Sequence, residues 1–277
     1  MRPRGLALIA LLLAAAPLAA QQPNTPAAPP APTTPGAQPA DPLDAYLTQW
    51  QQTMEGVQAL SATLKRTEKD QTTGTEKHLT GFTKYLHVSS GGTTQNLALL
   101  QMTEDGQSDF AQRFVCSGAF LYEFQPLDKK IVAHEIPKPK AGQVSDDNFM
   151  SFLFGMKKDD AKARYELKLD HTDDDYAYIM ITPRFAADKV DFKRAQIVIC
   201  KDTAKTRSVG IAGFPRRLWF ESPNSTETTW DVLQINNNDK TIDRREFDAP
   251  QPAPGWKMVA APKDEEPQPR VVRPSGN

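Results

Sequence analysis

Apolar and polar residues alternate along much of this chain, a pattern typical of β-strands that bury one side and expose the other. The clearest case is RYELKL at residues 164–169, in which apolar and charged residues take turns. Such runs follow one another with short turns between them, which indicates an antiparallel meander, hence a barrel or a strongly curved sheet. The runs predict strands at residues 59–69, 77–88, 97–102, 108–116, 120–124, 131–136, 165–169 (with residues 157–160 as its polar start), 176–182, 195–200, 208–211, 218–220 and 228–235.

Near the N-terminal end, apolar residues follow a helical period instead. Asp41 and Pro42 provide an N-cap and a proline at the first helical position, and we expect the helix to end at Gly56. Between them, spacings of three and four residues predict one apolar helix face. That face consists of Leu43, Tyr46, Leu47, Trp50, Met54 and Val57.

A second helix is predicted at residues 146–156, DDNFMSFLFGM, where two aspartates precede a dense apolar run. A short helix that is apolar on nearly every side must be covered on nearly every side, so we expect it inside or across the mouth of the sheet. Ordinary core packing and a pliable, methionine-containing lid both remain open. Its apolar residues are Phe149, Met150, Phe152, Leu153, Phe154 and Met156.

Residues 214–259 predict a strand, a tight turn, a second strand and a proline-bounded segment. Phe247 and Trp256 are the large apolar residues of that last segment. We expect them to pack against one end of the sheet, where they are poor candidates for ligand contacts.

The start of the chain has the organisation of a secretory signal peptide. Arg2 and Arg4 form a basic region, residues 6–13 an apolar run, and residues 19–20 a small-residue cleavage zone. The apolar run is shorter than the roughly 20 residues that span a bilayer, and no lipid-anchoring cysteine follows it. We expect an exported protein of the periplasm or cell envelope, without a transmembrane segment in the mature chain.

The remaining composition divides the chain into one domain and two tethers. Residues 1–20 form the predicted signal peptide. Residues 21–41 are rich in Pro and Ala, and residues 260–277 are Pro-rich and charged, so both are expected to be disordered. The domain is predicted at residues 42–259, a length that suits one mainly β unit, and we expect a monomer.

The net charge bears on the class of binding partner, and the two cysteines bear on disulfide formation. Of 33 basic residues, 31 remain without Arg2 and Arg4, and 34 acidic residues give a net charge of −3. This near balance does not favour nucleic acid. In an oxidising compartment Cys116 and Cys200 could form a disulfide, or they could be two separate buried thiols.

No catalytic or metal-binding motif stands out. The sequence contains no Gly-x-Ser-x-Gly elbow. The acidic run at residues 173–175 is best explained as a solvated turn. The four histidines are scattered singly, without metal-ligand spacing: His78, His87, His134 and His171. We therefore expect no enzymatic activity, no metal and no cofactor.

The order of these segments resembles that of the LolA-like superfamily of periplasmic lipoprotein carriers. The strand at residues 115–126, VCSGAFLYEFQP, loosely matches a family pattern of glycine, aromatic and tyrosine positions. The end of the chain matches the family's closing pattern at Asn238, Ile242, Asp243, Phe247, Pro254 and Gly255. The chain also looks like a planctomycete group of exported LolA-like proteins whose function is not established.

The resemblance implies a mainly β (α+β) fold, a curved antiparallel incomplete barrel with helices packed in or over its concave face. It implies that Tyr46 and Trp50, with the apolar residues of 146–156, line a cavity for a lipid or acyl chain. It also makes residues 214–259 the closing edge of the sheet. The carriers' Arg-Pro pair is missing here, where the sequence reads HVSSGGTTQNL, so lipoprotein cargo does not carry over.

Two functions follow from these expectations. The first is an exported, non-enzymatic protein that binds a hydrophobic ligand. The alternative is a cell-envelope interaction or sensor domain with a filled core and a protein partner.

Overall fold

The computed structural model describes residues 41–90, 93–136, 157–186 and 188–261, all within one compact unit. The predicted signal peptide and most of the two predicted tethers lie outside these residues. The predicted helix at residues 146–156 lies wholly outside them. Within the described part, no helix is long and apolar enough to cross a bilayer.

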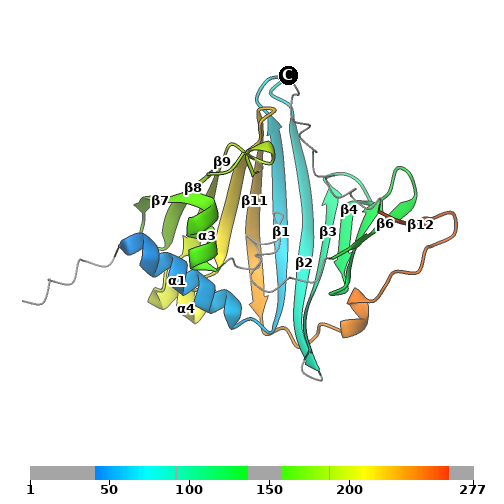
Figure 1. The fold of residues 1–277 in the computed structure, drawn as a ribbon, viewed down its shortest axis with the longest axis horizontal. Helices are drawn as coiled ribbons and strands as arrows, with labels where there is room; N and C mark the ends of the chain where they lie inside the picture. Colours follow the sequence, from blue (N-terminus) through cyan, green and yellow to red (C-terminus); the bar gives the residue numbers. More distant parts are fainter. Residues whose placement is uncertain (1–40, 91–92, 137–156, 187, 262–277) are drawn as a thin grey trace, which may run out of the picture. The chain divides into compact units, whose positions relative to one another are not determined.

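The described residues form twelve strands: β1 (Ala59–Asp70), β2 (Glu76–Ser90), β3 (Thr93–Glu104), β4 (Phe110–Cys116), β5 (Phe120–Gln125), β6 (Lys130–Glu135), β7 (Tyr165–Thr172), β8 (Tyr176–Pro183), β9 (Arg194–Cys200), β10 (Pro215–Glu221), β11 (Thr226–Asn237) and β12 (Lys257–Ala260). They make one sheet in the order β12-β6-β5-β4-β3-β2-β1-β11-β10-β9-β8-β7. The sheet is curved and open, with β12 and β7 at its edges (Figure 1). This confirms the predicted mainly β fold with an incomplete barrel.

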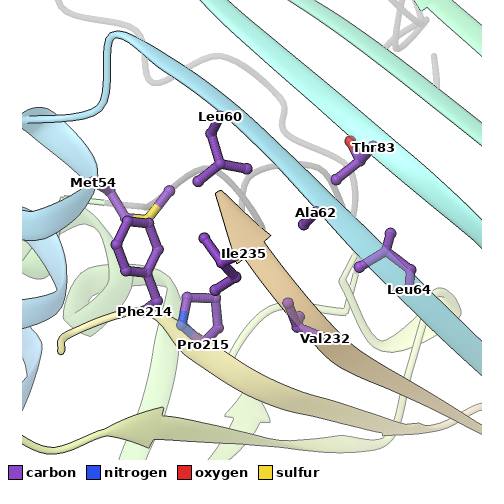
Figure 2. Close-up of a pocket in the computed structure, with 9 residues that line it drawn as sticks. All are labelled: Met54, Leu60, Ala62, Leu64, Thr83, Phe214, Pro215, Val232 and Ile235. Carbon is purple, nitrogen blue, oxygen red and sulfur yellow. The ribbon is translucent and has the colours of Figure 1, made fainter. Parts of the chain in front are cut away.

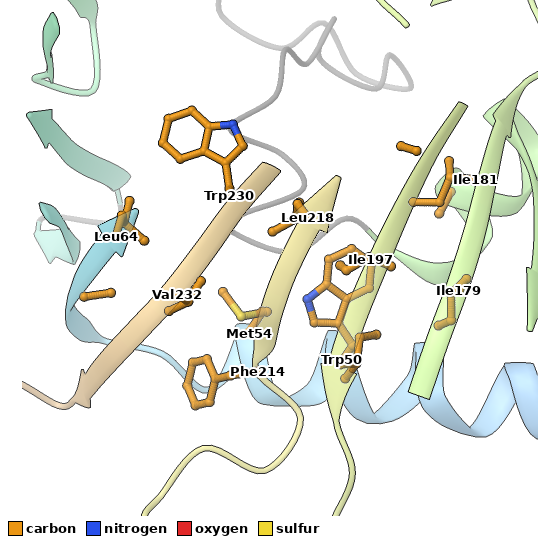
Figure 3. Packing of buried hydrophobic residues seen from close by; sticks show 14 of the residues in the cluster. Trp50, Met54, Leu64, Ile179, Ile181, Ile197, Phe214, Leu218, Trp230 and Val232 are labelled. Carbon is orange, nitrogen blue, oxygen red and sulfur yellow. The ribbon is translucent and has the colours of Figure 1, made fainter. Parts of the chain in front are cut away.

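The first helix, α1 (Pro42–Glu55), forms where the apolar period predicts it. The Leu43 N–H donates to Asp41 Oδ1 at 3.0 Å, and this bond caps the helix. Figure 3 shows Trp50 and Met54 of α1 against Ile197 and Leu218, on what we call the helix-bearing face of the sheet. The buried residues of α1 are Leu43, Leu47, Trp50 and Met54.

A second core lies on the opposite face, over β2 to β6. Neighbouring residues of a strand point to opposite faces, so Leu99 is turned away from Leu100, which belongs to the helix-bearing face. Phe247, in the 3-10 helix η2 (Arg244–Phe247), is 1% exposed in this second core. Trp256 is partly buried against it, with its ring 6.0 Å from that of Phe124. Both residues therefore serve as packing residues.

Two segments predicted as strand do not form strands. Residues Lys158–Arg164 form α3, because acidic residues in its first turn and basic residues in its last turn complement the helix dipole. Residues Ala204–Ser208 form α4, where the Thr206 N–H donates to Oγ1 of the capping residue Thr203 at 3.2 Å. Residue 208 ends α4 and residues 209–210 form the turn after it, so the strand predicted at 208–211 is wrong.

The closing stretch, residues 214–259, does not form a single edge. β11 pairs with β1 along its length, and β10 pairs with β11, so both strands lie inside the sheet. Only β12 reaches an edge, where it runs parallel to β6. The closing-edge interpretation is corrected accordingly, because the hydrophobic pattern of a strand does not encode which strand it pairs with.

The two cysteines lie far apart in the sheet. Cys116 ends β4 and Cys200 ends β9, and five strands separate β4 from β9. At about 4.8 Å per strand the gap along the sheet is well beyond the roughly 7 Å that a disulfide allows between Cα atoms. Both thiols are free, Cys200 buried and Cys116 half-buried.

Candidate functional site

An apolar pocket lies between the end of α1 and the helix-bearing face of β1 and β11 (Figure 2). Its free volume is about 30 Å³. Ligand pockets typically measure roughly 300–1,000 Å³, so the pocket is nearly closed. The lining residues are Met54, Leu60, Ala62, Leu64, Thr83, Phe214, Pro215, Val232 and Ile235.

Strand register explains why these side chains meet. Ala62 pairs with Ile235 of β11 on one side and with Thr83 of β2 on the other. The methyl side chain of Ala62 is the smallest in the pocket wall, so it leaves part of the pocket volume unfilled. The Thr83 hydroxyl donates to the Leu99 carbonyl at 2.9 Å, so its polar atom is already satisfied. The wall of the pocket is therefore apolar in character.

A tight contact holds the loop before β10 against α1. Gly213 has a φ of +79°, and a Cβ built on it would lie 2.1 Å from Thr53 Oγ1. Thr53 Oγ1 in turn donates to the Ala212 carbonyl at 3.4 Å, a long bond. A glycine is needed here because of the positive φ and because a Cβ would clash with Thr53. The contact places the next residue, Phe214, in the pocket wall.

A second hollow opens where β10 separates from β11. Their pairing ends at Arg217↔Asp231, whereas β11 continues to Asn237 with β1 as its neighbour. The register of β10 against β9 shifts at Arg216, whose Nη1 donates to the carbonyls of Val232 and Leu233. The hollow measures about 290 Å³, and we call it the β10–β11 groove.

The β10–β11 groove and the pocket share three wall residues, so they lie back to back. The shared residues are Pro215, Val232 and Ile235. The groove is further lined by Cys200, Val209, Ile211, Arg216, Leu233 and Gln234. Val209 and Leu233 are 62% and 47% exposed, which is unusual for aliphatic side chains facing a hollow.

Neither hollow contains a reactive nucleophile. Burial raises the pKa of the Cys200 thiol to about 11, so the thiol stays protonated at neutral pH. Among the residues that the structure describes, no cluster of three His, Cys, Asp or Glu side chains could hold a metal ion.

Of the residues singled out from sequence, Tyr46 and Trp50 lie in α1 and do not line the pocket. Trp50 is 3% exposed in the core, with no hydrogen-bond partner for its Nε1 among the described residues. Tyr46 is partly buried against the same core. Met54, one helical turn after Trp50, is the α1 residue that reaches the pocket. Phe149, Met150, Phe152, Leu153, Phe154 and Met156 lie outside the described residues.

The groove residues were missed by sequence reasoning, although a signal was present. The strand predicted at 218–220 is shorter than the strand predicted at 228–235 that pairs with it. The longer strand must then leave part of one edge without that partner. The β10–β11 groove lies at the part of β11 that extends beyond its pairing with β10.

No protein-family model and no curated protein sequence matches the chain. Among solved structures it is similar to a DUF1329 family protein from Desulfovibrio piger, with 11% identity, 76% of this chain and 98% of that chain covered, and a TM-score of 0.42. It is also similar to a LolA superfamily protein from Nitrosomonas europaea, with 12% identity, 76% and 99% coverage and a TM-score of 0.39. For the MucA/MucB complex of Pseudomonas aeruginosa the values are 14% identity, 75% and 61% coverage and a TM-score of 0.39. TM-scores at this level assign the chain to no family.

Proposed function

We propose that this protein is an exported, non-enzymatic binding protein that holds a lipid or an acyl chain on the helix-bearing face of its sheet. The observation that supports this is the pocket between α1 and β1, whose wall is apolar and whose one hydroxyl is already satisfied. In this proposal the predicted signal peptide directs the protein to the periplasm or cell envelope, where it acts as a monomer.

Ligand entry requires the pocket to widen, because its present free volume is about 30 Å³. The end of α1 is the part suited to move. Met54 has a flexible, polarisable side chain that can repack around an acyl chain, and the Thr53–Ala212 hydrogen bond that holds this turn is long. Each Å² of apolar surface buried would then contribute about 25 cal/mol to binding.

A matched pair of variants tests the pocket. Ala62→Leu fills it from β1, whereas Thr63→Leu places a leucine on the exposed opposite face of the same strand. We expect the purified wild-type protein to release a lipid on extraction, detected by mass spectrometry, and to bind a fluorescent fatty acid. A62L should weaken the fatty-acid signal several-fold, and T63L should leave it unchanged.

Two results would contradict the proposal. One is a wild-type protein that reproducibly releases no lipid on extraction and also does not bind the fluorescent fatty acid. The other is an A62L variant that has a wild-type circular dichroism spectrum and still binds as the wild type does.

A second function is favoured by the same small volume. If the core on the helix-bearing face is complete as it stands, the protein acts as a cell-envelope interaction domain. It would then recognise a protein partner through its surface instead of a lipid in its interior.

A further inference from the structure

We propose that the free edge of β11 in the β10–β11 groove binds an extended peptide segment of a partner protein, which adds to the sheet as a strand. This inference deepens the second function above and is independent of the lipid pocket. Such β-strand addition uses main-chain hydrogen bonds for affinity and side-chain pockets for specificity.

The register leaves backbone groups of β11 pointing into the groove. Successive residues of a strand direct their N–H and C=O groups to opposite sides. The Asn238 N–H donates to the Ala59 carbonyl of β1 at 2.6 Å. Gln234 and Asn236 therefore turn toward β1 as well, and the backbone groups of Ile235 and Asn237 turn toward the groove.

Arg216 keeps β10 away from this edge. Its guanidinium occupies the place where the next β10–β11 hydrogen bonds would form, and it satisfies the carbonyls of Val232 and Leu233. The nearby Arg194 and Arg217 pair with the carboxylates of Glu221 and Asp231, whereas the hydrogen bonds that Arg216 makes within the described residues go to backbone carbonyls. Its charge is therefore available to an acidic residue of an incoming peptide.

The outer edges of the sheet are protected, but this inner edge is not. β7 carries Glu166, Lys168 and Asp170, and β12 is only four residues long. Charged residues and short strands are the usual means of preventing edge-to-edge pairing. Residues 232–237, VLQINN, carry no charge. An unprotected edge of this kind is typical of a pairing site.

The shape of the groove favours a single strand over a second copy of this chain. The edge lies inside the sheet, with β10 and the residues after α4 on its other side. An isolated peptide can enter such a gap, whereas the edge of another folded sheet brings its own neighbouring strands. The exposed side chains of Val209 and Leu233 suit aliphatic residues at alternate peptide positions. The expected occupant is thus an extended, aliphatic peptide with an acidic residue near Arg216.

The test uses the full chain and a displayed library of seven-residue peptides built from Val, Ile, Thr, Gln and Glu. Selected peptides are synthesised and their affinities measured by fluorescence anisotropy. Val209→Lys places a charge in the groove, and Val190→Lys, at a site 72% exposed in the 3-10 helix η1 (Asp188–Val190), is its matched control. We expect V209K to weaken binding at least about tenfold, equal to about 1.4 kcal/mol, and V190K to leave it unchanged.

Two further measurements isolate the mechanism. N-methylation of alternate peptide nitrogens removes the main-chain donors that face β11, and it should abolish binding. Methylation of the other nitrogens should not. Arg216→Gln retains an amide donor but removes the charge, so it should weaken a glutamate-containing peptide more than its glutamine counterpart.

Several results would overturn the inference. They are a library without enriched peptides, selected peptides that bind V209K as tightly as the wild type, and fully N-methylated peptides that bind as tightly as the unmodified ones. A dimer of this protein in analytical ultracentrifugation that V209K converts to monomer would also overturn it. Competition by decanoate that is lost in V209K would instead identify the groove as a lipid site. A62L acts in the pocket and should leave peptide affinity unchanged, so failure of lipid binding and failure of peptide binding are observed separately.

Discussion

Asp239 joins the end of β11 to the start of β1 through a compact set of hydrogen bonds. Ser61 Oγ donates to Asp239 Oδ2 at 2.5 Å. The N–H and the hydroxyl of Thr241 donate to Oδ1 at 2.9 and 2.7 Å. These donors, Ser61 first, lower the pKa of Asp239 to about 2.

A lowered pKa makes this carboxylate a pH-dependent source of stability. The contribution is fully present above the ordinary pKa of about 3.9 and is lost as the pH falls through about 2. We expect urea unfolding of the wild type to become easier between pH 4 and pH 2, more steeply than for Asp239→Asn. Asp243, whose pKa Arg245 also lowers to about 2, titrates in both proteins, so the difference reports Asp239. Parallel pH profiles would contradict this account.

The sequence predicts the turn that contains Asp239, but it does not predict the hydrogen bonds that Asp239 accepts. Residues 236–239 are recognisable as turn-forming, and β11 ends there as expected. The partner, Ser61, is 178 positions away from Asp239. No local pattern links residues so distant, because their meeting depends on how β1 and β11 pair.

At the scale of elements, one contact sets how closely α1 approaches the loop before β10. Gly213 and Gly210 both have positive φ, at +79° and +72°. A Cβ at Gly213 would meet Thr53, whereas a Cβ at Gly210 would meet nothing within 4 Å. Comparing alanine at the two positions therefore separates the cost of backbone strain from the cost of a steric clash with α1.

This comparison makes a stability prediction. Gly210→Ala should lower the free energy of unfolding by about 1 kcal/mol, the cost of a left-handed backbone in a residue with a side chain. Gly213→Ala should lower it by about 3 kcal/mol, because overpacking against α1 adds to the same strain. Urea denaturation of both variants measures the difference. Equal losses would show that α1 and the loop do not press together.

Elements with a strong period were predictable, and short elements with local caps were not. α1 and the alternating strand β7 appear where the apolar pattern places them. α3 and α4 were missed, because each is short and depends on end effects. The pocket was missed for a different reason: its wall combines α1, β1, β2 and β11, and only the register brings Ala62, Thr83 and Ile235 together.

On the scale of the molecule, the sheet supports a separate core on each face. α1 covers one core, and the chain after β11, through Phe247 and Trp256, covers the other. The second core is smaller and belongs to β2 to β6. Removing a side chain from it should therefore loosen this part of the sheet first.

Phe247→Ala tests this division. Its side chain is 1% exposed, so the loss should be about 4 kcal/mol. Hydrogen exchange should accelerate in β4, β5 and β6 at conditions where β8 and β9 remain protected. Trp256→Ala, which removes a partly buried ring, should have a smaller effect of the same kind. Uniform acceleration across the whole sheet would show that the two cores unfold together.

The pairing of β1 with β11 also governs when the molecule can fold. Leu60 lies opposite Asn237 at the middle of the sheet, so the central ladder joins one of the first strands made to one of the last. Such contacts have a high contact order, which slows folding because a long loop must close before the ladder forms. During synthesis β1 and β2 can form a hairpin, but the sheet lacks its centre until β11 has been made. The chain therefore completes its fold late, and it stays open to other contacts for longer than a chain whose central strands are neighbours in sequence.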